Sequence, residues 1–317
     1  MLDFGIVIVS YNTRDLLRTC LRSVYASQGS FTSDVCVVDN ASLDGSAEMV
    51  TAEFPQARLI ANTENVGYPR ANNQGLEAFG FTEGPHANSR TPKFALLLNS
   101  DTELPPDAFA CMLDFMSEHP DAGMAGPRVV LPDGSLDLAC RRSFPTPEVS
   151  FYRLIKLSRL FPRSQRFGRY NLTYLDPDQV AEVDCVMGAF MLVRAEAIAQ
   201  VGLMDGQFFM YGEDLDWAYR IKAAGWKVYY NPAVTVLHVK RASTRQSRRA
   251  QVEFYRAMGI FYQKHYAART SWWLHVLVVG AISLRQKLEQ LRQSLAVKQR
   301  TEAKSRSQRR RLRSSLC

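Results

Sequence analysis

The sequence predicts an α/β domain built around a mostly parallel β-sheet, and three observations lead to that prediction. Short apolar, β-branched runs recur at 4–12, 34–42, 57–68 and 93–104. Each run ends in polar residues, and three of them lead into a stretch with helical spacing, an alternation that favours parallel strand pairing. The 317 residues are 46% hydrophobic, which is enough apolar material for one large domain or two modest ones.

The first two runs read as buried strands, each followed by a helix. The first helix is expected at 14–27, with Asn12 and Thr13 as candidate N-caps, and the second at 46–54. The third run reads as a strand and a turn. These elements make up the first half of the predicted sheet.

The remaining elements follow with one interruption. The fourth strand leads into a helix at 107–119, and 183–202 reads as a strand and a helix. The stretch at 226–243 is expected to give two more short strands. Between them, 133–180 mixes Pro, Arg and aromatic residues, so we interpret it as a long excursion that could carry substrate specificity.

Polar residues gather where the predicted strands end. In open parallel sheets, ligands bind beyond the carboxyl ends of the strands. Neither GxGxxG nor GxxxxGK[ST] occurs, so neither a dinucleotide fold nor a P-loop is supported. The tips offer acids, amides and hydroxyls, which suit a ribose, a base edge and a divalent cation. The tip segments are Ser10-Tyr11-Asn12, Asp39-Asn40, Asn65-x-Gly67 with Arg70, and Asn99-Ser100-Asp101.

The net charge of +8 hides an asymmetry along the chain. Residues 240–317 hold 19 Lys/Arg and 3 Asp/Glu, whereas 1–239 hold 20 and 28. The apolar stretch 272–284 begins with two Trp and is too short to span a bilayer, which takes about 20 residues. With the basic tail 285–317 behind it, this stretch fits a segment that lies on an anionic membrane surface. The alternatives are a domain-packing helix with a solvated tail, and nucleic-acid binding, for which the tail lacks interleaved aromatics.

The cysteines and the start of the chain favour a cytoplasmic protein. Six Cys show no CxxC pair and no tight clustering, which suits reduced thiols better than a disulfide framework. No signal peptide is expected, because "MLDFGIVIVSYN" has no basic region before its short apolar run.

Eight segments of the chain together resemble the bacterial family 2 glycosyltransferases of the GT-A fold, particularly their rhamnosyltransferase-like branch. The resemblance covers roughly residues 4–243. It rests on "VIVSYN", "VVDNAS", "NVGYPRANNQG", "LLLNSD", "GAFMLVR", "FFMYGEDLDWAYR", "GWKVYYNP" and "VLH", in that order. The resemblance implies a nucleotide-sugar donor, a divalent cation and a carboxylate base.

Carried across residue by residue, the resemblance implies a donor site at the strand tips. Ser10 and Tyr11 would border the base, Asp39 would hold the base or the ribose, and Arg70 would lie near the diphosphate. A turn or a helix cap is the alternative role for Asp39 and Asn40. The full set expected to bind the donor is Ser10, Tyr11, Asn12, Asp39, Asn40, Asn65, Gly67, Arg70, Asn99 and Ser100.

The resemblance also implies a metal site, although its first acid is replaced. The family's Asp-x-Asp motif here reads Asn99-Ser100-Asp101. Asp101 is left as the carboxylate for Mg²⁺ or Mn²⁺, whose other ligands would be donor phosphates and water. His238 matches a position that some relatives use as a second ligand, and an imidazole would favour Mn²⁺. A strand-end His bonded to the backbone is the alternative.

Three acids cluster in "YGEDLDWAYR" at 211–220. Asp216 and Arg220 are spaced i,i+4 and could pair on one helix face. Glu213 and Asp214 would lie in the first helical turn, where the helix dipole favours their charged forms. The resemblance implies that Asp214 is the general base and that Glu213 assists in acceptor binding or orientation. The alternative is that all three acids only cap the helix.

Two further residues are candidates for the acceptor side. In the family, the "GAFMLVR" segment lies beside the acceptor and the donor sugar, where Gly188 would let the backbone approach closely. Trp217 could form the floor of the acceptor site. A packing glycine and a core tryptophan are the respective alternatives.

Together these features predict an inverting, metal-assisted transferase that moves L-rhamnose from dTDP-rhamnose to a cell-envelope or lipid-linked glycan, at the inner face of the cell membrane. Residues 1–243 would form the catalytic domain, with a nucleotide-binding half at 1–110 and an acceptor half at 111–243. A helical extension at 244–284 and the basic tail would follow. A degenerate nucleotide-sugar-binding scaffold, suggested by Asn99, and a basic nucleic-acid binder are the alternative functions.

Overall fold

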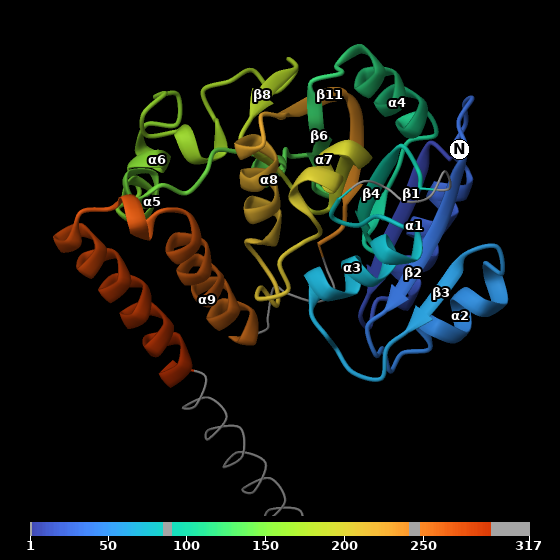
Figure 1. The fold of residues 1–317 in the computed structure, drawn as a ribbon, viewed down its shortest axis with the longest axis horizontal. Helices are drawn as coiled ribbons and strands as arrows, with labels where there is room; N and C mark the ends of the chain where they lie inside the picture. Colours follow the sequence, from blue (N-terminus) through green and yellow to red (C-terminus); the bar gives the residue numbers. More distant parts are fainter. Residues whose placement is uncertain (1, 85–90, 241–247, 293–317) are drawn as a thin grey trace, which may run out of the picture. The chain divides into compact units, whose positions relative to one another are not determined.

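The structure is a computed structural model that describes residues 2–84, 91–240 and 248–292 (Figure 1). The chain forms two compact units, Met1–Arg245 and Gln246–Cys317, which we describe separately.

The first unit alternates strands and helices in its first half. These elements are β1 (Phe4–Ser10), α1 (Arg14–Tyr25), β2 (Ser33–Asp39), α2 (Ser46–Glu53), β3 (Arg58–Ala61), α3 (Tyr68–Ala78), β4 (Phe94–Asn99), β5 (Thr102–Glu103) and α4 (Ala108–Glu118). The second half contains β6 (Ala122–Val130), β7 (Arg141–Arg142), α5 (Pro147–Leu154), α6 (Leu157–Leu160), β8 (Ala181–Val183), β9 (Cys185–Val186), β10 (Phe190–Arg194), α7 (Ala195–Val201), α8 (Glu213–Ala223) and β11 (Lys227–His238). Single turns of 3₁₀ helix occur at Leu138–Cys140 and Arg169–Asn171.

The central sheet confirms the predicted α/β class. Its nine strands follow the order β3-β2-β1-β4-β10-β6-β11-β5, with β8 also paired to β11. The first four strands in that order are parallel, as are β6 and β11. The strand β10 runs antiparallel to both β4 and β6, so the sheet is mixed beyond β4. The strands β7 and β9 form a separate antiparallel pair.

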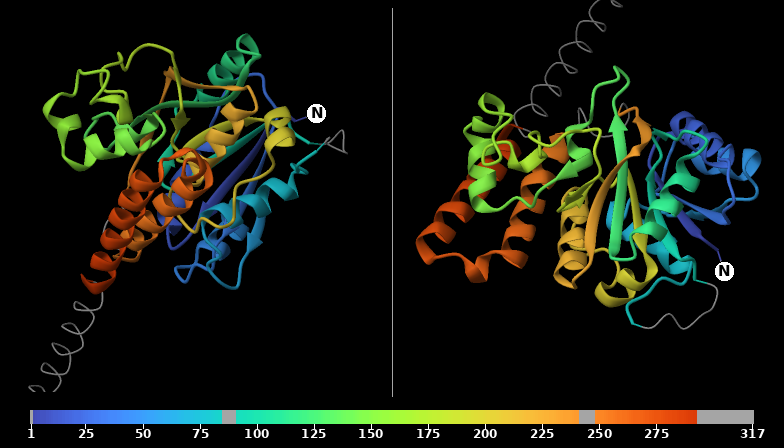
Figure 2. Two further views of the ribbon diagram at one scale, coloured as in Figure 1. Left: turned by 60° about the vertical axis from the view of Figure 1, so that its left-hand side comes forward. Right: turned by 90° about the horizontal axis from the view of Figure 1, so that it is seen from above.

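Helices cover both faces of the sheet (Figure 2). Alternate residues of β1 point to opposite faces, as the two-residue repeat of a strand requires. Phe4, Ile6 and Ile8 join one apolar core cluster with residues of α1, α2 and α4. On the other face, Gly75 of α3 lies directly against Val7. This packing fixes the helices and therefore the loops that carry the strand tips.

Two parts of the sheet differ from the sequence-based expectation. The strand β6 was not predicted, because "AGMAGPRVV" contains two Gly and a Pro, which are poor strand formers. Its close neighbours explain the glycines: a Cβ on Gly126 would lie 2.7 Å from the Cβ of Val186. The two short strands expected at 226–243 are one strand, β11, whose pairing with β6 shifts between Asn231 and Thr235. Pro232 lies in that irregularity, where a missing N–H does not break the ladder.

The second unit is helical. It contains α9 (Arg248–His265), a 3₁₀ turn at Ala267–Arg269 and a further helical stretch over 272–292. A hydrogen bond of 3.1 Å joins the Tyr262 hydroxyl to Nδ1 of His275. Trp272 is 79% exposed, and none of the helices within 2–84, 91–240 and 248–292 is long and apolar enough to cross a bilayer. Residues 293–317 of the predicted basic tail lie outside the described residues.

Candidate active site

The strand tips meet at one edge of the sheet, as the sequence predicted. Ser10 pairs with Asp39 across β1 and β2, and Val9 pairs with Asn99 across β1 and β4. Because these three strands are parallel, their last residues end at the same edge. The tips therefore form one polar surface, although Asn99 itself is only half-buried.

Hydroxyl groups link β1 to the loop after β4. The Thr13 hydroxyl lies 2.9 Å from the hydroxyl of Ser10 and 2.9 Å from that of Ser100. Thr13 precedes α1, but its side chain does not cap the helix, contrary to the expectation. A carboxylate oxygen of Asp44 instead accepts from the Arg14 N–H at 2.8 Å. The helix start is thus capped from the β2–α2 loop, and Thr13 is used to join the tips.

Asp39 offers a buried acceptor at the tip of β2. The side chain is 3% exposed, and its Oδ2 accepts from the Ser42 N–H at 2.9 Å. Its Oδ1 is buried and finds no hydrogen-bond donor among the residues that the structure describes. A buried carboxylate oxygen without a donor is costly unless a ligand satisfies it. This atom suits a hydroxyl or amino group of a bound nucleoside.

Asn40 and Asn65 shape the same surface by bonding to each other. The Asn40 amide donates to Oδ1 of Asn65 at 2.9 Å, and Oδ1 of Asn40 accepts from the Val66 N–H at 3.0 Å. Oδ1 of Asn65 also accepts from the Gly67 N–H at 3.0 Å. These amides therefore hold the loop after β3 in place.

Asn12 lines a hollow beside the strand tips, and Tyr11 precedes it in the same loop. Tyr11 is 42% exposed, and Asn12 adopts a left-handed φ of 54°. The Asn12 amide oxygen accepts from the Leu43 N–H at 2.8 Å, which ties the two loops together. The hollow has a volume of about 270 Å³ and is lined by Asn12, Thr13, Arg14, Asp15, Leu16 and Asp44.

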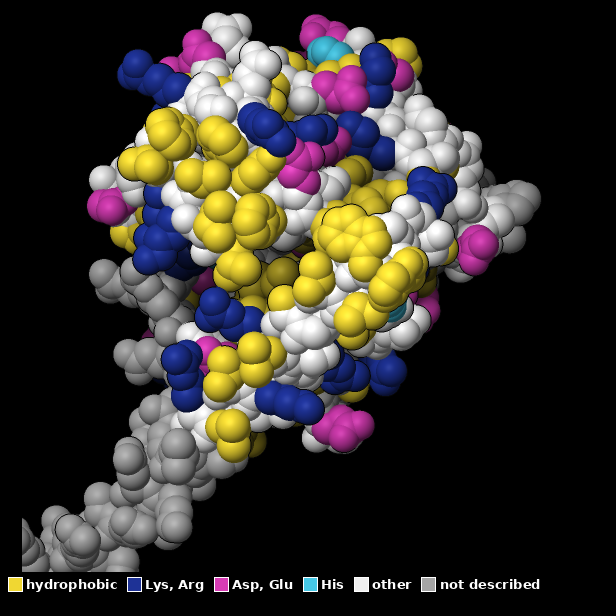
Figure 3. Space-filling view, turned by 90° about the vertical axis from the view of Figure 1, so that its left-hand side faces the viewer, with side chains coloured by type: hydrophobic (Ala, Val, Ile, Leu, Met, Phe, Trp, Pro, Cys, Tyr) yellow, Lys and Arg dark blue, Asp and Glu magenta, His cyan; other side chains and the backbone are white. Residues whose placement is uncertain are grey.

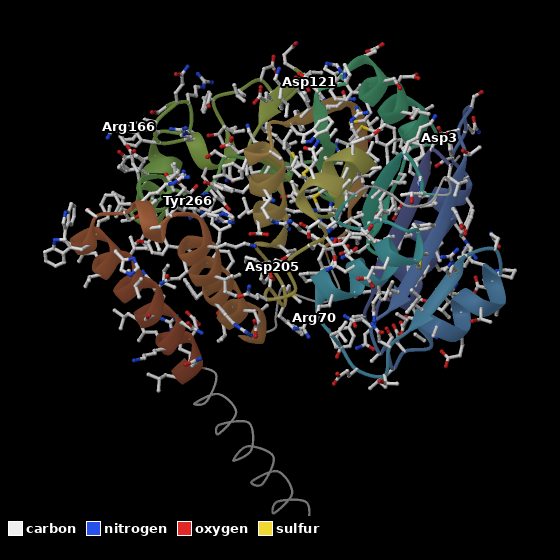
Figure 4. All side chains as sticks on the ribbon, viewed as in Figure 1. Asp3, Arg70, Asp121, Arg166, Asp205 and Tyr266 are labelled. Carbon is white, nitrogen blue, oxygen red and sulfur yellow. The ribbon has the colours of Figure 1, made fainter. Side chains whose placement is uncertain are left out.

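Gly67 joins the nucleotide side of the site to the loop before α8. Its φ of 88° is unfavourable for any residue with a side chain, and a Cβ there would lie 2.7 Å from the Phe209 carbonyl oxygen. The same carbonyl accepts from the Tyr68 N–H at 2.8 Å. Arg70 donates from Nε to the Gly206 carbonyl at 3.1 Å, and Figure 4 labels it beside Asp205.

Asp101 and His238 lie together and could supply two ligands to a cation. Nε2 of His238 lies 3.2 Å from Oδ1 of Asp101, and both side chains are largely buried. Nδ1 of His238 faces Oδ2 of Asp137 at 3.7 Å, and Lys240 pairs with that same oxygen at 2.6 Å. A carboxylate behind a histidine is a common second shell of metal sites. No group of three or more His, Cys, Asp or Glu suited to a metal occurs in the described part of the chain, so substrate oxygens would have to complete the coordination.

The charges of this cluster depend on one another. Burial would raise the pKa of Asp137, but hydrogen bonds with His238 and Lys240 outweigh it and lower that pKa to about 2. Burial would lower the pKa of His238, whereas Asp101 and Asp137 raise it above its ordinary value. The two carboxylates therefore attract positive charge to this position.

Asp214 is held by a buried arginine. Its Oδ2 accepts from Nη2 of Arg142 at 2.5 Å, and its Oδ1 accepts from the Leu215 N–H at 2.8 Å. Nη2 of Arg142 also donates to the Val186 carbonyl at 2.8 Å. Burial alone would lower the pKa of Arg142, but Asp214 raises it well above its usual value. The two paired side chains are about nine-tenths buried.

The Glu213 carboxyl group is not in the charged state that was expected for an acid at a helix start. Burial, and then the charge of Asp214, raise the pKa of Glu213 to about 8. Its Oε2 is buried without a donor among the described residues. The helix dipole contributes at most about 2 kcal/mol in partly buried sites, which desolvation and a neighbouring carboxylate exceed. Burial and the neighbouring carboxyl group thus favour the neutral form of Glu213 near neutral pH.

Tyr68 lies where the cation side and the acid side of the site meet. Burial, and then the charges of Glu213, Asp214 and Asp101, raise the pKa of its hydroxyl. That hydroxyl donates to the Gly188 carbonyl at 2.9 Å. A Cβ on Gly188 would meet the Tyr68 hydroxyl at 3.5 Å, an ordinary contact. The Tyr68 side chain thus ties α3 to the segment before β10.

The rest of α8 is structural. Asp216 is fully buried and accepts from Nε of Arg220 at 2.9 Å, which confirms the predicted i,i+4 pair. Trp217 is also fully buried, and its indole N–H donates to the Gly202 carbonyl at 2.9 Å. The assignment of Trp217 to the acceptor site is therefore wrong, because a core side chain offers no face to a sugar.

Sequence reasoning missed Arg142, Tyr68 and Asp137. Arg142 lies in "CRRSFPTP", inside the excursion that the sequence left without a chemical interpretation. Its only local signal is a pair of arginines ahead of an aromatic residue, and nothing in that spacing points to a carboxylate 72 positions later.

The chain is similar to known proteins over most of its length. Residues 3–253 match the family described as "Glycosyltransferase like family 2". The N-acetylglucosaminyl-diphospho-decaprenol L-rhamnosyltransferase of Mycobacterium tuberculosis is 29% identical over 287 residues, which cover 89% of this chain and 91% of that protein. The low-salt glycan biosynthesis hexosyltransferase Agl10 of Haloferax volcanii is 23% identical, over 74% of this chain and 67% of that one.

Solved structures share the fold. The structure of GalNAc-T7 with UDP, GalNAc and Mn²⁺ matches with a TM-score of 0.56 at 14% identity, over 90% of this chain and 55% of that one. The mannosyltransferase PcManGT of Pyrobaculum calidifontis, in complex with GDP-Man and Mn²⁺, matches with a TM-score of 0.53 at 16% identity, over 85% and 65%. The chain thus spans between half and two thirds of the length of these structures.

Proposed function

Because the chain belongs to the glycosyltransferase-like family 2, which makes it a glycosyltransferase, we propose that it transfers L-rhamnose from dTDP-rhamnose to a lipid-linked glycan with inversion at the anomeric carbon. The relative from M. tuberculosis supports this sugar and this kind of acceptor through its name and through similarity over nearly its whole length. The dTDP carrier follows from the resemblance to the rhamnosyltransferase-like branch.

The observation that carries the proposal is the convergence at Tyr68. Beyond the effect of burial, Asp214 and Asp101 both contribute to raising the pKa of the Tyr68 hydroxyl, which donates to the Gly188 carbonyl at 2.9 Å. A displacement with inversion needs a base on one face of the sugar and charge neutralisation on the other. Asp214 would supply the base, and a cation at Asp101 would supply the neutralisation.

On the donor side, the chain would bind the nucleoside through the strand tips. The free Oδ1 of Asp39 would accept from a hydroxyl or amino group of the nucleoside, and the Asn40–Asn65 pair would hold the surrounding loop. Asp101 and His238 would hold Mg²⁺ or Mn²⁺. When bound, that cation would neutralise charge on the departing diphosphate.

On the acceptor side, Asp214 would take the proton. The acceptor hydroxyl oxygen forms a bond to the anomeric carbon, its proton moves to a lone pair of the Asp214 carboxylate, and the bond to the nucleoside diphosphate breaks. Arg142 orients Asp214, since it fixes Oδ2. Glu213, protonated near neutral pH, would donate a hydrogen bond to the acceptor through its unsatisfied carboxyl group.

A donor panel tests this function. Purified protein is incubated with dTDP-rhamnose, UDP-GlcNAc, UDP-galactose and GDP-mannose, each with Mn²⁺ and an N-acetylglucosaminyl-diphospho-polyprenol acceptor, and nucleotide release is measured. We expect release from dTDP-rhamnose above all others, and loss of that release with EDTA. Release from another donor would refute the rhamnosyl assignment, and binding without release from any donor would favour the scaffold.

A further inference from the structure

The segment α5–α6 carries an apolar surface where a soluble protein has a polar one. A helix of a soluble domain normally turns one apolar stripe inward and a polar face to water. In α5, Val149 and Tyr152 are buried, as expected for the inward side. The opposite stripe, at i, i+3 and i+4 spacing, is Phe151, Leu154 and Ile155, and these side chains are 54%, 55% and 47% exposed.

The same surface continues into α6. Leu160 is 69% exposed and Phe161 is 48% exposed. The helix α5 ends at Leu154 with Ile155 as its C-cap, and Lys156 takes a left-handed φ of 64° before α6 begins. Figure 3 shows apolar side chains gathered on this side of the molecule with Lys and Arg among them. We call the five residues Phe151, Leu154, Ile155, Leu160 and Phe161 the α5–α6 apolar surface.

The α5–α6 apolar surface belongs to an ordered segment. The Thr146 side chain caps α5 by accepting from the Val149 N–H at 3.2 Å. Behind the surface, Tyr152 packs edge-on against Phe167 at 4.9 Å between ring centroids. Its hydroxyl donates to Glu148 at 2.6 Å. The apolar side chains are therefore presented outward by a packed segment.

Positive charge surrounds this surface. Between 147 and 169 there are six Lys/Arg and a single acid, Glu148. All six are exposed (Figure 4 labels Arg166): Arg153, Lys156, Arg159, Arg163, Arg166 and Arg169. Arg166 pairs with Glu148 at 3.1 Å, whereas Lys156, Arg159 and Arg163 pair with no carboxylate in the described part of the chain. Exposed apolar side chains ringed by cations without partners complement an anionic lipid surface.

The surface lies close in sequence to the residue that holds the proposed base. Arg142, which bonds Asp214, precedes the first residue of α5 by five positions. Five residues span at most about 18 Å of extended chain. A bilayer touching α5–α6 would thus lie near the acceptor side of the active site, where a lipid-linked acceptor presents its sugar.

We propose that the α5–α6 apolar surface and its cations dock the catalytic unit directly on the surface of an anionic phospholipid bilayer. This docking is separate from any membrane contact of 272–317. It rests on the proposed function in one respect, because a lipid-linked acceptor gives the docking its purpose. Membrane docking would also give a function to part of the irregular segment 133–180.

Hydrogen exchange on the full chain locates the contact. Amide exchange is compared with and without vesicles of phosphatidylcholine and phosphatidylglycerol at 3:1, and with vesicles of phosphatidylcholine alone. We expect slower exchange over 147–163 with the anionic vesicles and no change over α4. Protection confined to 248–292 and the tail would overturn the proposal. Coverage of this surface by another part of the chain would overturn it as well. In either case the vesicles would not slow exchange over 147–163.

Substitutions test the two kinds of group separately. We expect Leu160→Glu with Phe161→Glu to lower the partition of the full chain onto anionic vesicles at least tenfold, because two exposed anchors become anions. The control Val180→Glu changes an apolar residue outside the surface that is 48% exposed, as Phe161 is, and should leave partition unchanged. Partition of the double variant within twofold of wild type would overturn the proposal.

The charge arm uses the triple variant Lys156→Ala, Arg159→Ala and Arg163→Ala. It should also lose vesicle binding, by at least tenfold at low salt. The control is the triple variant Arg22→Ala, Lys93→Ala and Lys227→Ala. It removes the same charge from exposed positions elsewhere, and its vesicle binding should fall much less. Equal losses would refute a specific role for the surface. Vesicle binding requires no sugar transfer, so failure of the rhamnosyl assignment and failure of docking would be seen separately.

Discussion

The pair between Arg142 and Asp214 gives the sharpest single prediction. The substitution Arg142→Met keeps most of the side-chain volume and removes the charge that faces Asp214 at 2.5 Å. The side chains are only 10% and 11% exposed, so solvent cannot replace the lost partner. Removing one member of a buried pair costs about 3–5 kcal/mol. We expect a loss of that size in the free energy of unfolding near pH 7.

The same substitution should change catalysis in a particular way. Without Arg142, Asp214 loses the cation that stabilises its charged form, and it takes up a proton more readily because burial favours its neutral form. The acidic limb of the activity profile should move to higher pH, and activity near pH 7 should fall by 10²–10⁴-fold, the range of a general base.

A double-mutant cycle measures the coupling. Urea unfolding is followed for wild type, Arg142→Met, Asp214→Asn and the double variant. We expect a coupling free energy of about 2–3 kcal/mol, as for contacting residues. The control cycle uses Arg141→Met, whose guanidinium is also buried but bonds the carbonyls of Leu175 and Asp176, and it should show no coupling. Additive effects of Arg142→Met and Asp214→Asn within about 0.5 kcal/mol would refute the reasoning.

Three further predictions concern neighbouring parts of the site. Between pH 4.5 and about 8, the unfolding free energy of wild type should fall by a few kcal/mol relative to that of Glu213→Gln, because folded Glu213 keeps a proton that the unfolded chain releases. Urea unfolding at a series of pH values checks this. Parallel plots of unfolding free energy against pH for the two proteins would contradict it. Asp137→Asn should weaken Mn²⁺ binding by 10–100-fold, since it removes the carboxylate behind His238. Calorimetry of Mn²⁺ binding in the presence of a nucleoside diphosphate checks this. An unchanged Mn²⁺ affinity would show that Asp137 does not support the metal site. Gly67→Ala should destabilise by about 1–3 kcal/mol through its positive φ and the Phe209 carbonyl, measured by thermal unfolding, and a stable variant would show that the loop adapts.

Much of the site's nucleotide side could be predicted because it lies at strand ends. The apolar run that ends in Asp39 is local, and the rule that parallel strands end at one edge places Ser10, Asp39 and Asn99 together. The i,i+4 spacing likewise placed Asp216 beside Arg220. These inferences needed only short-range sequence patterns and one rule of sheet geometry.

The acid side needed tertiary information. The charge of Glu213 is set by burial and by Asp214, and burial cannot be derived from helix position alone. Arg142 comes from a segment with no helical or strand periodicity, so its contact with α8 was invisible in the sequence. Trp217 illustrates the same limit, because an aromatic residue beside a cluster of acids has the same local sequence whether it faces the core or a ligand.

The rate of nucleotide release from dTDP-rhamnose in the presence of the lipid-linked acceptor, compared between wild type and Asp214→Asn, tests the central claim most directly. The variant keeps the size of the side chain but replaces one carboxylate oxygen with an NH₂ group, so it lacks the basic carboxylate. We predict that its turnover falls at least 100-fold while its affinity for dTDP stays within a few-fold of wild type. Turnover within threefold of wild type would contradict the account, because Asp214 would then not take the proton.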